Sequence, residues 1–78
     1  MPHIVIKCIA GPSREQLQQA AEEISAVVVN TLGKQMKHTS VSVEEYSFAE
    51  WEGVYNRDIK GKDNLLIKPG YTNPVTFD

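Results

Sequence analysis

The chain has few of the features that stabilise very small proteins by covalent or metal cross-links. Its 78 residues include one cysteine, Cys8, so no disulfide bond can form within the chain. The two histidines, His3 and His38, have no neighbouring cysteine or carboxylate at the spacing of a zinc site, so we expect no metal. A domain of this size buries only about 60% of the surface of its unfolded chain. Self-association is therefore the stabilising device that remains.

The chain also lacks the features of nucleic-acid-binding and membrane proteins. Its formal net charge is −2 and its lysines are scattered, so no basic surface for a phosphate backbone is expected. No apolar run approaches the roughly 20 residues that a membrane span needs, and no signal peptide is recognisable. There is no internal repeat or linker. We expect one cytoplasmic domain, residues 1-78, without a nucleic-acid or membrane partner.

The amino-terminal stretch, residues 1–9, predicts a β-strand that begins directly after a proline. Its side chains alternate with the period of two of a strand, with Ile4, Ile6 and Cys8 on one face and His3, Val5 and Lys7 on the other. When an aminopeptidase removes Met1, Pro2 becomes the amino terminus and its nitrogen becomes a secondary amine that can accept a proton. A terminus that belongs to a sheet is held in place. Pro2 is therefore a candidate catalytic base.

Residues 13–32 predict one long amphipathic helix. Ser13 and Gln16 have the spacing of a capping box, in which the serine hydroxyl accepts from the glutamine amide. Apolar residues then recur at steps of three and four and form one stripe: Leu17, Ala20, Ala21, Ile24, Val27, Val28 and Leu32. Gly33 is placed to end a helix of about five turns.

A second strand is expected over residues 39–46, where the period returns to two. Val41 and Val43 point to one face, and Ser40, Ser42 and Glu44 point to the other. The order strand, helix, strand predicts a β-α-β unit with parallel strands and a right-handed connection. The helix covers one face of this sheet, and nothing comparable covers the other. We therefore expect a homo-oligomer in which Pro2 of one subunit lies near residues of another.

The last third of the chain is less regular. Phe48, Trp51, Val54 and Tyr55 have roughly helical spacing, interrupted by Gly53, which predicts a short helix or turn. This aromatic cluster either fills a core or forms the wall of an aromatic pocket. Beyond it we expect a polar turn over residues 56–63, a short apolar run at 65–67, a Pro-Gly turn, and a tail over 72–78 that is loose or drapes over a neighbour.

These features together resemble the 4-oxalocrotonate tautomerase family. The resemblance covers nearly the whole chain, and it is closest to the small subgroup that closes with Ile-Lys-Pro-Gly-Tyr. The features that carry it are Met1-Pro2, the nine-residue strand, the loop at Gly11, Ser13-x-x-Gln16, the strand Ser-Val-Ser-Val-Glu-Glu at 40–45, Trp51, and Ile67 to Tyr71.

The resemblance implies an α+β fold, in which a β-α-β tautomerase-like subunit with parallel strands, one long helix and a short C-terminal helix or turn assembles into a homodimer or homohexamer. It implies a keto-enol tautomerase (isomerase) without cofactor or metal, in which Pro2 acts as general base and acid. The substrates would be small 2-oxo acids or their enols. Trp51 is assigned to substrate binding, in a pocket suited to an aryl-bearing substrate.

Two arginines that hold the substrate in well-studied members of that family are absent here. Pro12 follows the loop glycine in place of one, and Ser42 occupies the position of the other in the second strand. A substrate carboxylate needs a cation or several hydrogen-bond donors. We therefore assign Arg14 and Ser42 to substrate binding, with Arg14 as the first candidate for the cation. Lys7 and Arg57 of the partner subunit are the alternatives.

Two other functions stay open. If Met1 is retained, the nitrogen of Pro2 is an amide, and the protein would be a catalytically inactive, oligomeric small-molecule-binding relative. Within the family, a protonated amino-terminal proline can instead act as an acid for hydration or dehalogenation, a role that requires a raised rather than a lowered pKa.

Overall fold

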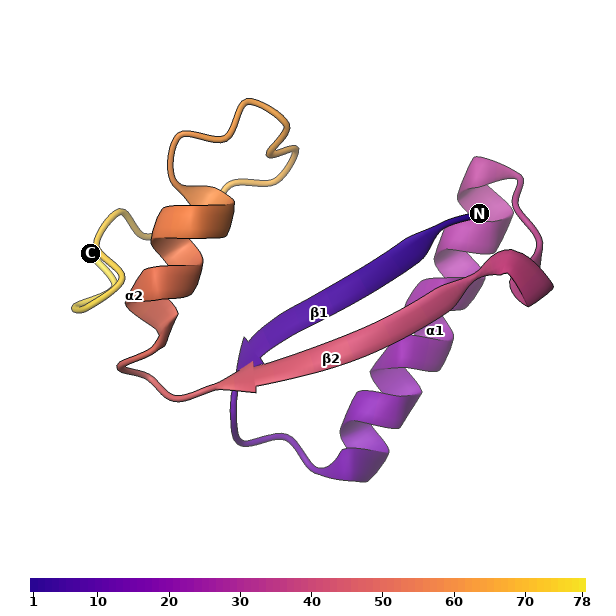
Figure 1. Cartoon of the computed structure of the whole chain (residues 1–78), viewed down its shortest axis with the longest axis horizontal. Helices are drawn as coiled ribbons and strands as arrows, with labels where there is room; N and C mark the ends of the chain where they lie inside the picture. Colours follow the sequence, from indigo (N-terminus) through magenta and orange to yellow (C-terminus); the bar gives the residue numbers. More distant parts are fainter. The chain divides into compact units, whose positions relative to one another are not determined.

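Two strands, one long helix and a short 3-10 turn make up the first of the two units into which the chain divides, residues 1–45. In the computed structural model, which describes residues 1–78, β1 (His3–Ile9) and β2 (Ser40–Tyr46) are neighbours in a two-stranded sheet. Their arrows point the same way in Figure 1, so the strands are parallel. The fold class predicted from the sequence is confirmed.

The helix α1 (Arg14–Leu32) begins and ends at the predicted residues. The backbone N–H of Gln16 donates to the Ser13 hydroxyl at 3.1 Å, and the Ser13 N–H donates to the Gln16 side chain at 2.8 Å. At the other end Gly33 adopts the left-handed conformation, with φ 65°, and its N–H donates to the carbonyl of Val29. At each end of α1 the cap residue therefore satisfies one of the backbone groups that have no partner within the helix.

The side of α1 that faces the sheet is narrower than the predicted apolar stripe. Leu17 and Ala21 lie with Val41 and Val43 of β2 around one small hollow, so this part of the helix packs on the strand. The buried residue of α1 is Ser25, a polar residue that the apolar pattern did not include.

The hydroxyl of Ser25 is satisfied within the helix, because it donates to the carbonyl of Glu22 at 2.8 Å. The flank of the stripe stays open, since Ile24 is 37% and Val27 62% exposed. A two-stranded sheet is too narrow to cover an apolar stripe of that width. Part of the predicted helix face is therefore open in the single chain.

The second unit, residues 46–78, contains α2 (Trp51–Val54) and the π-helical segment η2 (Tyr55–Ile59), which follows directly. Gly53 lies inside α2 and does not interrupt it. The expected polar turn is wrong at its start, because residues 56–59 are helical. The Lys60 N–H donates to the Tyr55 carbonyl at 2.8 Å, five residues earlier, and this bond closes the wider turn of a π-helix.

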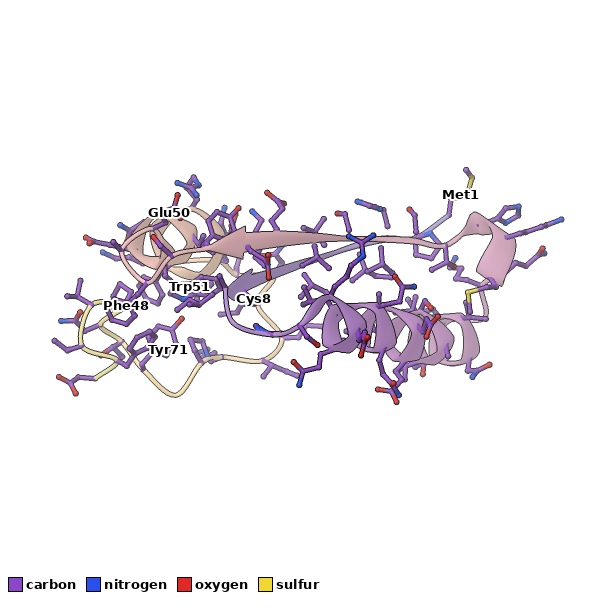
Figure 2. The ribbon with its side chains drawn as sticks, turned by 90° about the horizontal axis from the view of Figure 1, so that it is seen from below. Met1, Cys8, Phe48, Glu50, Trp51 and Tyr71 are labelled. Carbon is purple, nitrogen blue, oxygen red and sulfur yellow. The ribbon has the colours of Figure 1, made fainter.

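Aromatic side chains contact one another throughout the second unit. All the aromatic residues of the protein belong to it: Tyr46, Phe48, Trp51, Tyr55, Tyr71 and Phe77. The ring centroids of Phe48 and Phe77 are 5.2 Å apart, and those of Tyr71 and Phe77 are 4.9 Å apart. Figure 2 shows Phe48, Trp51 and Tyr71 close together. Val54, 1% exposed, is the most deeply buried side chain.

The carboxyl-terminal tail folds back on itself, so the prediction that it is loose was wrong. The Asn73 side chain accepts from the Val75 N–H at 2.9 Å, and the N–H groups of Thr72 and Asn73 both donate to the carbonyl of Asp78. These bonds bring Phe77 against the other rings of the unit.

None of the helices in the chain combines the length and the apolar character of a membrane span.

Candidate functional site

Pro2 lies at the entrance to β1 and is tied to the neighbouring strand. Its carbonyl accepts a hydrogen bond from the Ser40 N–H, the first residue of β2, at 3.2 Å, and the proline is half-buried. The pyrrolidine ring fixes the backbone torsion at the nitrogen. The proline ring is therefore held at the start of the strand through its own carbonyl.

His3 stands next to Pro2 in a cluster of side chains that link the two strands. Its Nδ1 lies 2.7 Å from the Ser40 hydroxyl, and its Nε2 lies 3.4 Å from the Ser42 hydroxyl. All three side chains are exposed, on the strand positions that alternate with the half-buried Ile4, Val41 and Val43. The predicted residues Pro2 and Ser42 are thus joined through two residues that the sequence did not single out.

Arg14 lies apart from this cluster within the same unit. It is the exposed first residue of α1 and borders the hollow between α1 and β2, of about 190 Å³. Figures 1 and 2 show the amino terminus at the same end of the unit as the carboxyl-terminal end of α1, so at the opposite end of the helix from Arg14. One copy of the chain therefore does not bring Arg14 to its own Pro2.

Trp51 belongs to the aromatic cluster of the second unit. Its Nε1–H donates to the Tyr71 hydroxyl at 2.8 Å, and its ring meets that of Tyr46 edge-on, with centroids 6.2 Å apart. It is half-buried. The sequence left two roles open for Trp51, core filling or the wall of an aromatic pocket. Its observed contacts are those of core filling, and the part of its surface that is not covered is accessible to a ligand.

Arg57 lines a hollow of the second unit, of about 500 Å³. Its guanidinium lies over Gly53, where an added Cβ would stand 2.8 Å from a guanidinium nitrogen, so glycine makes room for this arginine. Two carboxylates, those of Glu50 and Glu52, line the same hollow. Because these acidic groups outnumber the one arginine, the hollow is a poorer place for an anionic ligand than the predicted role of Arg57 requires.

Glu50 belongs to a second capping box. The Ser47 N–H donates to its carboxylate at 2.7 Å, and its own N–H donates to the Ser47 hydroxyl at 3.2 Å. The backbone N–H of Ser47, and then its hydroxyl, hold the pKa of the Glu50 carboxyl below its ordinary value. The box opens the turn that leads into α2 and gives this carboxylate a structural role.

Two features of the sequence could have identified the residues that the sequence analysis did not single out. The spacing Ser47-x-x-Glu50 is a capping box of the same form as the one recognised at Ser13. His3 could have been assigned to the same sheet face as Ser40 and Ser42 by extending the alternation of the two parallel strands, since all three fall on the face away from the valines of β2.

Comparison with known proteins gives one family and several relatives. Residues 2–51 match the family model described as "Tautomerase enzyme". A "Probable tautomerase" of Xylella fastidiosa is 36% identical over 73 residues, which cover 91% of this chain and 89% of the relative. "Tautomerase PptA" of Escherichia coli O127:H6 is 32% identical over 74 residues, covering 92% of this chain and 99% of the relative. The sequence similarity thus includes most of both units.

Solved structures share the fold. TomN, a 4-oxalocrotonate tautomerase homologue in the tomaymycin biosynthetic pathway, has a TM-score of 0.61 at 28% identity, covering 64% of this chain and 77% of TomN. YwhB, also a homologue of 4-oxalocrotonate tautomerase, has a TM-score of 0.59 over 86% of this chain and the whole of YwhB. At 21% identity the likeness to YwhB concerns the fold alone.

Proposed function

The chain belongs to the tautomerase enzyme family, and on this premise we propose that it is a cofactor-free keto-enol tautomerase whose base and acid is the nitrogen of Pro2. Its substrates are small 2-oxo acids or their enols. The observation that carries the proposal is the attachment of Pro2 to Ser40 through its carbonyl, at 3.2 Å, because this bond holds a terminal residue that would otherwise be free to move.

The chemistry follows from the nitrogen that removal of Met1 exposes. An α-amino group has an ordinary pKa of roughly 7.7 to 8.0, close to the range in which general acid-base catalysis is efficient. The neutral amine accepts a proton from carbon 3 of the 2-oxo acid, and the resulting ammonium delivers that proton to the carbonyl oxygen to form the enol. In the reverse direction the neutral amine accepts the proton of the enol hydroxyl, and the ammonium returns it to carbon 3. No electron is transferred to another molecule, so the reaction needs no redox cofactor.

The other predicted site residues bind the oxygen atoms, the carboxylate and the aryl group of the substrate. Ser42, joined to Pro2 through His3 and Ser40, donates its hydroxyl to a substrate oxygen. Arg14 binds the carboxylate from a neighbouring copy, since it lies at the opposite end of α1 from its own Pro2. The exposed edge of Trp51 contacts an aryl group of the substrate.

We further propose that all 78 residues act as one domain of a homodimer or homohexamer. Support comes from the small amount of apolar surface that a single chain buries, since Val54 is its one buried hydrophobic residue. Large hydrophobic side chains are exposed in both units, among them Val27 at 62% and Leu66 at 95%. Exposed apolar surface of this extent is typical of protein interfaces.

The test is the ketonisation of an aryl enol-pyruvate, followed by ultraviolet absorbance, with the wild-type protein and Pro2→Ala. We expect kcat/KM to fall by about 10²- to 10⁴-fold, the usual contribution of a general acid-base group. The control is Pro12→Ala, which removes an exposed proline from the loop before α1 and should leave the rate unchanged. Equal rates for wild type and Pro2→Ala would exclude the proline mechanism.

Intact-mass measurement on protein made at native levels separates the proposal from the inactive alternative. Loss of Met1 leaves the secondary amine that the mechanism requires. A protein that keeps Met1 and shows no turnover would instead be the small-molecule-binding relative, because an amide nitrogen cannot accept the proton.

A further inference from the structure

We propose that His3 is a positioning residue of this site, which holds the Ser42 hydroxyl so that its proton points toward a carboxylate or carbonyl oxygen of the substrate. The inference rests on the proposed function and adds to it a residue that acts through Ser42. It stands on three hydrogen bonds that run in series from Pro2 to Ser42.

The series begins at Ser40, which contacts both of the first two strand residues. Its backbone N–H donates to the Pro2 carbonyl at 3.2 Å, and its hydroxyl lies 2.7 Å from Nδ1 of His3. One residue of β2 therefore fixes the position of the proline and the rotation of the imidazole ring together.

The ring then sets the direction of the next hydroxyl. With the Ser40 O–H donating to Nδ1, the neutral imidazole carries its proton on Nε2, which lies 3.4 Å from the Ser42 oxygen. A serine hydroxyl has one proton and two lone pairs. When Nε2–H donates to one lone pair, the hydroxyl proton must point elsewhere, and on this exposed face it is available to a substrate oxygen.

The arrangement is particular to one of the two histidines. His38 ends the 3-10 turn η1 (Met36–His38), is exposed, and its ring has no hydrogen-bonding partner. Lys7 and Glu44, which share the exposed sheet face by alternation, have interactions of their own. The ring of His3 is bonded to serine hydroxyls alone, so its two nitrogens are available for the donor and acceptor roles described.

A double-mutant cycle tests the coupling. We expect His3→Ala and Ser42→Ala each to lower kcat/KM by roughly 3- to 10-fold, the effect of one hydrogen bond. The double variant should lose no more than Ser42→Ala alone, because His3 acts through that hydroxyl. His38→Ala, the matched control, should keep the wild-type rate. The proposal would be overturned if the loss of kcat/KM in the double variant equalled the product of the two single losses, or if His3→Ala kept the wild-type rate.

Two further variants separate positioning from a merely structural role. The amide nitrogen of His3→Gln can reach the place of Nε2, whereas that of His3→Asn reaches only the place of Nδ1. We expect His3→Gln to recover most of the lost kcat/KM and His3→Asn to recover little, while urea denaturation gives similar stabilities for both. Equal rates for the two variants would count against the inference.

Nitrogen-15 NMR of the imidazole rings detects the contact between His3 and the Ser42 hydroxyl independently of enzyme activity. The Nε2 signal of His3 should shift in Ser42→Ala and that of His38 should not; an unmoved His3 signal would remove the basis of the proposal. Failure of the proposed function is distinguishable, because it appears as loss of the dependence on Pro2. An intact dependence on Pro2 with a failed His3 cycle would overturn this inference alone.

Discussion

The two units of the chain are stabilised in different ways. The first unit, residues 1–45, is built from regular elements, of which α1 is capped at both ends, and its most buried residue is a serine. The second unit, residues 46–78, has only short helical segments, yet it contains Val54 and every aromatic side chain. Long regular elements characterise the first unit, and contacts between aromatic rings characterise the second.

This difference explains where chemistry and stability are placed. The first unit carries the proposed site residues Pro2, His3 and Ser42 on its sheet, with the side chains of His3 and Ser42 exposed. The second unit packs its half-buried and exposed aromatic rings against one another around the buried Val54. A small chain can therefore keep an exposed polar site because another part of the same chain supplies much of the apolar packing.

The largest effect should come from the buried valine. Val54→Ala removes two methyl groups' worth of packing from the interior and is expected to lower the free energy of unfolding of the second unit by about 2 kcal/mol. Val75→Ala, at a position that is 52% exposed, is the control in the same unit. Amide hydrogen exchange resolved by residue should show faster opening in residues 46–78 than in α1. Uniform acceleration over both units would break the comparison.

A glycine at the end of α1 tests the capped backbone of the first unit. Gly33→Ala places a Cβ on a residue with φ 65°, which should cost about 1.5 kcal/mol in urea denaturation. Gly70→Ala, in the second unit, has open space around the added Cβ and no positive φ, so its free energy of unfolding should stay near that of wild type. Equal losses would show that the cap does not matter.

The hydrogen bond between Trp51 and Tyr71 sharpens the description of the aromatic unit. Tyr71→Phe keeps the ring but removes the acceptor of the indole N–H, and we expect a loss of about 1 kcal/mol in the midpoint-derived free energy of unfolding. Tyr55→Phe is the control, because it also removes a tyrosine hydroxyl but one without a hydrogen-bond partner. A similar loss in both variants would argue that ring packing alone decides stability.

The smallest effect is a pH dependence at the second capping box. The pKa of Glu50 is lower in the folded chain than in the unfolded one, so its contribution is present at neutral pH and is lost as the pH falls through the folded value. In Glu50→Gln, the acid-side slope of stability against pH should be shallower than in wild type. Identical slopes in wild type and Glu50→Gln would contradict the role of the box.

The regular part of the fold was predictable because its determinants are local. The period of β1, the Ser13 box and Gly33 each act within a few residues, and the structure has these elements at the expected places. The π-helical turn and the tail were not predicted. They depend on contacts between distant residues, such as Trp51 with Tyr71, 20 positions apart, whose pairing no local pattern reveals.

The candidate site was likewise predictable only where local sequence determines it. Pro2 stood out because its chemistry depends only on its place in the chain. The partnership of His3 with Ser40 joins residues 37 positions apart and follows from the register of the strands, which sequence alone leaves undetermined. The apolar stripe of α1 was recognised as a pattern, but which part of it the sheet covers depends on the width of the sheet.

The position of the only tryptophan has a practical consequence. Since the first unit has no aromatic residue, the intrinsic fluorescence of the protein originates entirely from the second, whereas the proposed proton-transfer group is at the start of the first. An emission change on adding a non-aromatic 2-oxo acid would therefore be an optical signal that occupancy at the amino terminus is felt by the aromatic unit of the same or a neighbouring copy.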